Sequence, residues 1–181
     1  QANKSGADYS ICGDCPHKGE PTNEPTRKLA KDRTCYVRID QGALIVWKAY
    51  NRGIYPSLTN SDDIAAIAAG RMIRLGTYGD PAVVPSHIWD SLLRLKKGHT
   101  AYSHQSGIKS ADVRHDLYMT SADNARQASE AWAEGRRTFR VISAVSEKIK
   151  GEILCPASEE MGRKTTCENC GLCAGNSIAA K

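Results

Sequence analysis

The chain has 181 residues, seven of them cysteine, and carries a formal net charge of +5. This length predicts a single domain over residues 1–181, and the odd number of cysteines excludes complete disulfide pairing. The sequence has no signal-peptide core and no apolar run long enough to span a bilayer, so we expect no membrane association. The unpaired cysteines indicate a soluble protein of a reducing compartment, the cytoplasm.

The modest basic excess permits contact with nucleic acid without requiring it. Small basic clusters at residues 94–97 and 136–137 are typical of ordinary solvated faces, and only 6% of residues are aromatic. The sequence therefore predicts no stacking platform for single strands, and nucleic acid is a weakly supported partner.

The first 40 residues are polar, rich in glycine, proline and charge, and contain Cys12, Cys15 and Cys35. Such a segment is expected to be a loop region ordered by metal rather than by a core. Residues 42–52 are apolar and then basic, which favours a helix, although residues 44–47 could also begin a strand. Residues 61–63 (S-D-D) are expected to cap a short alanine-rich helix that stops at Gly70.

Strands and helices then alternate. The pattern predicts strands at residues 72–75, 100–103, 116–120 and 138–142, with a possible fifth at residues 152–154. Amphipathic helices are predicted from Pro85 to the K-K-G signature at residues 96–98, and from a cap at Ser121 to Gly135. This order predicts an α/β fold over residues 41–154, with a small, mostly parallel sheet or a partial (β/α) barrel, flanked by metal-ordered N- and C-terminal loops.

Right-handed crossovers place the carboxyl ends of all parallel strands on one rim, where ligands bind. Several polar residues follow the predicted strands, and Cys155 follows the possible fifth. We expect Asp80, His104 and Gln105 as catalytic candidates, although His104 could be a hydrogen-bonded loop residue and Asp80 a turn former. The other rim residues are Gly76, Thr77, Gly79 and Ser103, expected to bind a cofactor, and the polar Thr120, Ser121 and Ser143.

The last part of the chain, residues 155–181, carries the most specific motif. Cys155-Pro156 precedes C-E-N-C-G-L-C, which contains Cys167, Cys170 and Cys173. Three thiolates at C-x2-C-x2-C spacing with a remote Cys-Pro are typical of a [4Fe-4S] cluster site. Zinc is the alternative, because C-x2-C is also a zinc knuckle.

The N-terminal cysteines offer three ligands. Three thiolates can hold three irons of a cubane and leave the fourth open, whereas structural metal sites are closed. One alternative is structural zinc bound by Cys12, Cys15, Cys35 and His17. Another is that no metal binds and Cys35 packs as a small apolar residue.

Three stretches of the chain, taken together, resemble a family of uncharacterised cysteine-rich proteins encoded by bacteriophages and plasmids. They are C-G-D-C-P with C-Y-V, then I-R-L-G-T-Y-G-D-P-A-V-V-P with T-A-Y-S-H-Q, and the closing C-P-A-S-E-E-M-G-R-K-T-T-C-E-N-C-G-L-C. The resemblance covers most of the chain and implies a phage or plasmid origin, hence the host cytoplasm. It implies no particular activity.

A more distant likeness is to radical S-adenosylmethionine enzymes. These begin with a three-cysteine cluster loop, followed by a helix and a strand that ends in a Gly-Gly-Glu-Pro-like turn. Here the same order is Cys12, Cys15 and Cys35, a helix, and a strand ending in Gly79-Asp80-Pro81, although the usual C-x3-C-x2-C spacing is absent. The likeness implies S-adenosylmethionine as a cofactor, and it implies an auxiliary cluster in the tail.

The sequence thus favours an iron–sulfur protein with two [4Fe-4S] centres that acts in redox or radical-type chemistry. Its expected partners are an electron donor or a small-molecule ligand. The alternative is a zinc-stabilised module that binds nucleic acid or protein without catalysis. Whether the protein is an enzyme is left open by the sequence.

Overall fold

A computed structural model describes residues 2–105 and 114–177 of the chain. Its centre is a four-stranded sheet in the order β1-β2-β3-β4, and every neighbouring pair is parallel. The strands are β1 (Met72–Leu75), β2 (Gly98–Ser103), β3 (Met119–Ala122) and β4 (Thr138–Arg140). The predicted α/β fold with a small parallel sheet is therefore confirmed.

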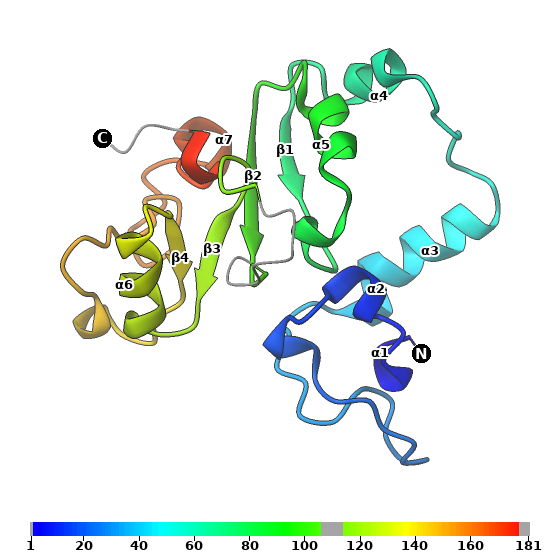
Figure 1. Cartoon of the computed structure of the whole chain (residues 1–181), viewed down its shortest axis with the longest axis horizontal. Coiled ribbons are helices and arrows are strands. Elements are labelled where there is room, and N and C mark those ends of the chain that lie inside the picture. The colour runs from blue at the N-terminus through cyan, green and yellow to red at the C-terminus, as the bar shows by residue number, and fades with distance from the viewer. Residues whose placement is uncertain (1, 106–113, 178–181) are drawn as a thin grey trace.

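Helices pack against this sheet as the crossover rule requires (Figure 1). Helix α5 (Ser86–Leu93) joins β1 to β2, and α6 (Ala125–Ala133) joins β3 to β4. The small core contains Leu75, Ala101 and Leu93, packed with the residues that precede β3, Leu117 and Tyr118. Helix α4 (Ser61–Ala68) lies beside α5, away from the sheet.

The opposite face of the sheet carries polar and aromatic side chains. Because successive side chains of a strand alternate between faces, Arg74 and Tyr102 face away from Leu75 and Ala101. The guanidinium of Arg74 lies 5.5 Å from the centre of the Tyr102 ring, which in turn packs on Phe139 with ring centres 4.7 Å apart. Arg74, Tyr102 and Phe139 of this face line the pocket described below.

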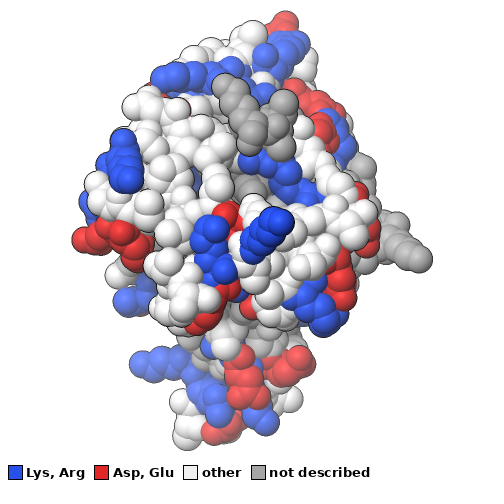
Figure 2. Space-filling view, turned by 90° about the vertical axis from the view of Figure 1, so that its left-hand side faces the viewer, with Lys and Arg blue, Asp and Glu red and all other residues white. Residues whose placement is uncertain are grey.

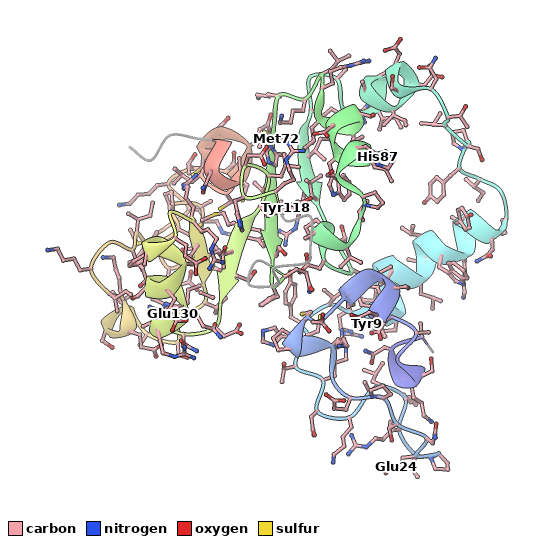
Figure 3. The ribbon with its side chains drawn as sticks, viewed as in Figure 1. Tyr9, Glu24, Met72, His87, Tyr118 and Glu130 are labelled. Carbon is pink, nitrogen blue, oxygen red and sulfur yellow. The ribbon has the colours of Figure 1, made fainter. Side chains whose placement is uncertain are left out.

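The N-terminal segment lies beyond the carboxyl ends of the strands (Figure 1). It contains α1 (Ala2–Ser5), α2 (Tyr9–Cys12) and a 3-10 turn at Pro16–Lys18. A hairpin excursion follows, and its outer end, marked by Glu24, points away from the sheet (Figure 3). The chain then enters a π turn (Ile39–Ala43) and α3 (Leu44–Asn51), so the predicted helix is confirmed.

The C-terminal tail docks at the other end of the strands. It contains α7 (Cys167–Cys170) and a 3-10 turn at Gly175–Ser177, and α7 lies near the amino ends of β3 and β4 in Figure 1. Another 3-10 turn, Val145–Glu147, precedes the tail and lies near the carboxyl end of β4, where Arg140 donates to the Glu147 carbonyl at 2.9 Å. The Ala101 amide donates to the carbonyl of Cys173 at 3.0 Å, and the Asn176 amide to that of His115 at 2.7 Å. The tail is therefore hydrogen-bonded both to β2 and to the turn before β3.

Several details of the predicted elements are wrong. Helix α5 ends at Leu93, and the K-K-G signature lies in the turn and first residue of β2. The strand predicted at 116–120 begins at Met119 and runs to Ala122, because residues 115–117 form a turn. Ser121 therefore lies inside β3 and caps nothing.

Asparagine side chains cap the two helices instead. Asn60 accepts from the Asp62 amide and Asn124 from that of Gln127, since an asparagine oxygen satisfies free amides of a first helical turn. Residues 152–154 form no strand. The Glu152 carboxylate is bound by Arg140 and by the Ile149 amide, which holds the chain in a loop.

Candidate functional site

A pocket of about 620 Å³ lies between the carboxyl ends of the strands and the N-terminal segment. It is lined by strand and rim residues, including Arg74, Tyr102 and Phe139, and by the loop region of the first 40 residues. The three N-terminal cysteines, Cys12, Cys15 and Cys35, all line it. Its position is the one where open parallel sheets bind their ligands.

The C-G-D-C turn is held to the rim by Gln105. The buried amide of Gln105 donates from Nε2 to the Cys12 carbonyl at 3.1 Å and accepts from the Asp14 amide at 3.1 Å. Gly13 has a φ of +53°, and a Cβ there would lie 2.7 Å from Oε1 of Gln105. A glycine is therefore required where the turn approaches this side chain.

The turn after β1 supports the same loop. The Asp80 amide donates to the carbonyl of Ile11 at 2.7 Å, and a Cβ on Gly79 would lie 2.5 Å from that oxygen. The buried Asp80 carboxylate accepts from the amides of Ala82 and His104, at 3.0 and 2.8 Å. Both oxygens of Asp80 thus fix backbone, so its side chain joins the first two strand ends.

Cys35 reaches the pocket because the chain between it and Cys15 folds back on itself. Glu20 and Lys31 exchange two backbone hydrogen bonds of 2.8 Å and close the excursion. The amide of Cys35 then donates to the carbonyl of His17 at 2.9 Å. Cys35 consequently lies next to the C-x2-C turn although nineteen residues separate it from Cys15 in the sequence.

Burial disfavours the thiolate forms of both cysteines in the turn. It raises the pKa of Cys12 to about 12, with further increases from the negative charge of Asp8 and from the neighbouring thiols of Cys15 and Cys35. Burial is also the main cause that raises the pKa of Cys15. A cation that binds these thiols must displace their protons.

Two histidines and an aspartate meet beside this turn. His17 Nε2 lies 3.1 Å and His104 Nε2 lies 3.4 Å from the same oxygen, Oδ1 of Asp123. Asp123 was not predicted from the sequence, because β3 was expected to end at residue 120. A correct strand end would have placed Asp123 on the rim with His104.

The tail cysteines form a second group. Cys173 interacts electrostatically with Cys155, Cys167 and Cys170, and burial raises its pKa. The hydroxyl of Tyr102 forms a hydrogen bond with the Cys173 thiol, which opposes that increase. Tyr102 also lines the pocket, so one side chain contacts both regions.

The structure brings most predicted rim residues together. Gly76, Thr77, Gly79, Asp80 and His104 line the pocket, whereas Ser103 is fully buried beneath it and accepts from the Gln105 amide at 2.9 Å. The hydrogen bonds give Asp80 and Gln105 positioning contacts, and their catalytic role stays a prediction. Ser121 lines the pocket, but Thr120 and Ser143 do not, and Cys155 belongs to the tail group.

Among the described residues, His17, His104 and Asp123 are a group of three whose ligand atoms all lie within 4.8 Å of one another, and no three cysteines do so. The spacing of a single metal ion's ligands is therefore met by the two histidines and Asp123, and by no set of three cysteines in the described part of the chain.

Comparisons with known proteins give this chain no relatives: no family model, no curated protein and no solved structure matches it.

Proposed function

We propose that the protein is an iron–sulfur protein with two [4Fe-4S] centres that acts in redox or radical-type chemistry on a small molecule. Cys12, Cys15 and Cys35 would hold the first cluster, and Cys155, Cys167, Cys170 and Cys173 the second. The observation that carries the proposal is that Cys35 and the two cysteines of the C-x2-C turn line one pocket at the ligand-binding rim of a parallel sheet. With three protein ligands, one iron is left free to bind a ligand in the pocket.

The cysteine spacing of the tail motif favours a cluster over zinc. Three thiolates at C-x2-C-x2-C spacing with a remote Cys-Pro are typical of a [4Fe-4S] site, whereas C-x2-C alone is also a zinc knuckle. Among the described residues, no three cysteines form a group with the ligand spacing of a single metal ion.

The pocket supports a small-molecule ligand. Its volume of about 620 Å³ lies within the range of roughly 300–1,000 Å³ that small-molecule sites occupy. The turn at Gly79-Asp80-Pro81 contacts the C-x2-C loop through the Ile11 carbonyl. In the likeness to radical S-adenosylmethionine enzymes, this turn corresponds to the Gly-Gly-Glu-Pro-like turn that follows the cluster loop and a helix. S-adenosylmethionine is therefore the first ligand to test.

The hairpin between Cys15 and Cys35 also bears on that likeness. It removes most of the intervening sequence from the pocket, so the three cysteines follow one another closely in space despite their unusual spacing. The second cluster would have all its ligands from protein. Such a closed centre suits electron transfer from a donor or bracing of the tail.

The alternative of nucleic-acid binding gains little from the surface. On the face shown in Figure 2, basic and acidic side chains are interspersed rather than gathered into a basic patch. A phosphate-binding surface would need clustered Lys and Arg residues.

The described residues include no helix that combines the length and the apolar character needed to cross a membrane.

The test is anaerobic purification followed by iron, sulfide and zinc analysis. Two cubanes predict about eight irons per chain. Replacing Cys35 by Ser should remove about half of the iron and replacing Cys170 by Ser the other half. Addition of S-adenosylmethionine should perturb the paramagnetic-resonance signal of the reduced wild type and not that of the Cys35→Ser variant. A colourless protein with stoichiometric zinc would reject the proposal.

A further inference from the structure

We infer that His17, His104 and Asp123 form a separate binding site for one divalent transition-metal ion. The three side chains come from parts of the chain as far as 106 positions apart, and they meet at the mouth of the pocket. Two imidazoles and one carboxylate are a ligand set for zinc or iron(II) that leaves coordination positions open. The site lies beside the cysteine loop and uses none of its thiols.

The distances between the ligand atoms fit one ion. A metal bound at about 2.0–2.1 Å in tetrahedral geometry holds its ligand atoms about 3.3 Å apart. The two Nε2 atoms lie 3.1 and 3.4 Å from Oδ1 of Asp123, one below and one above this value. The rings of His17 and His104 meet edge to face with centres 4.9 Å apart, so both nitrogens approach the carboxylate from different directions.

The remaining ring nitrogens are also held, as is usual for histidines that bind metal. Nδ1 of His17 lies 2.7 Å from the hydroxyl of Thr34, and Nδ1 of His104 lies 3.8 Å from the sulfur of Cys15. The backbone amide of His104 is fixed by the Asp80 carboxylate. Each imidazole is therefore oriented before an ion arrives, which lowers the entropic cost of binding.

Solvent can reach the site. The side chains of His17, His104 and Asp123 are 34%, 24% and 37% exposed, and all three line the pocket. The positions left open by the three protein ligands can therefore be taken by water or by an anionic group of a ligand. We expect the ion to bind carboxylate or phosphate oxygens of the molecule that occupies the pocket.

Mn²⁺ is the probe that separates this site from the thiols, because it prefers nitrogen and oxygen ligands and binds thiolates weakly. Anaerobic full-length protein is titrated with Mn²⁺, and loss of the free-ion paramagnetic-resonance signal is measured. One Mn²⁺ per chain is expected. Asp123→Asn and His17→Ala should weaken binding at least tenfold, and Thr34→Val, which removes the partner of His17, about tenfold.

Two matched variants serve as controls. Asp63→Asn removes an exposed carboxylate of α4, and His87→Ala an exposed imidazole of α5 (Figure 3). Both should bind Mn²⁺ like the wild type. Equal binding by all variants, or no binding by the wild type, would overturn the inference.

Iron and sulfide analysis of the same samples keeps this result apart from the proposed clusters. Asp123→Asn should retain its iron. Mn²⁺ binding in a protein without iron would reject the clusters and leave this site intact, whereas iron without Mn²⁺ binding would do the opposite.

Discussion

The side chain of Gln105 spans the C-G-D-C turn, because it donates to the carbonyl of Cys12 and accepts from the amide of Asp14. One residue just after β2 thus fixes the backbone of the turn at Cys12 and Asp14. These two hydrogen bonds anchor the C-G-D-C turn to the sheet.

Replacing Gln105 by Leu should loosen the turn. The Cys12 carbonyl and the Asp14 amide would lose their partners in a buried place, and we expect a loss of about 2 kcal/mol in the free energy of unfolding. Urea denaturation measures the loss of stability, and iron analysis measures whether the loosened turn also retains less iron. Gln41→Leu, at an exposed position, should change neither. A Gln105 variant with unaltered stability would contradict this anchoring of the turn.

Gly79→Ala should separate the rim from the cysteine loop. The new Cβ would lie 2.5 Å from the carbonyl oxygen of Ile11, in addition to the strain of a φ of +101°. Gly70→Ala is the matched control, because its φ is +66° but no atom lies within 4 Å. We expect about 1 kcal/mol of destabilisation for Gly70→Ala and about 3 kcal/mol for Gly79→Ala in urea denaturation. Equal losses would show that the contact is unimportant.

Glu152 should make the protein sensitive to acid. Its hydrogen bonds from Arg140 lower the pKa of the carboxyl group, so the folded state binds protons less readily than the unfolded state. This stabilisation is complete above about pH 4.5 and is lost as the pH falls through the folded-state pKa. The stability difference between wild type and Glu152→Gln should therefore shrink in urea denaturation below pH 4.

The exposed pair of Arg126 and Glu130 is the comparison for that experiment (Figure 3). Solvent screens this pair, so Glu130→Gln should differ little from the wild type at any pH. A Glu152 variant whose stability difference stayed constant from pH 7 to 3 would argue against the ion pair as the cause.

His99 should also make the protein less stable as the pH falls, but in a higher pH range than Glu152. The ring is buried, and its Nε2 donates to the Leu117 carbonyl at 3.0 Å. Burial lowers the pKa of His99, so protonation favours the unfolded state and stability falls as the pH drops below about 6.5. His99→Gln should flatten the profile of unfolding free energy between pH 7 and 5, whereas the exposed His87→Gln should leave it unchanged.

Tyr102→Phe tests the contact between the sheet and the tail. In the proposed tail cluster, a hydrogen bond to a cysteine sulfur would stabilise the reduced state, so its loss should lower the reduction potential of that cluster. Iron content should stay at the wild-type value, since the ring still packs on Phe139. Redox titration followed by paramagnetic resonance measures the shift. The exposed Tyr50→Phe should give the wild-type potential.

Most of the fold was predictable, since short strand-like runs alternate with helical segments and polar rim residues follow β1 and β2. The start of β3 was not, because Leu117 and Tyr118 read as strand residues but pack in a turn against the tail. A Cβ on Gly175 would lie only 2.7 Å from the carbonyl oxygen of His115 and from the amide of Tyr118. Only the three-dimensional structure shows this insertion.

The candidate site was also predictable only in part, because local sequence patterns identify some of its residues and not others. Cysteine spacing and the polar strand ends identified the thiols, Asp80 and His104. The pairing of His17 with Asp123 depends on a contact across 106 positions and on the true end of β3. Local sequence patterns carry no signal for such a contact.

The hairpin between Cys15 and Cys35 has a consequence for recognising related chains. Glu20 and Lys31 close it at its base, so residues can be added or removed near Glu24 without moving the third cysteine. A fixed-length motif would miss such sequences. A pattern that demands C-x2-C-P-H, a gap of any length, and then a cysteine would find them.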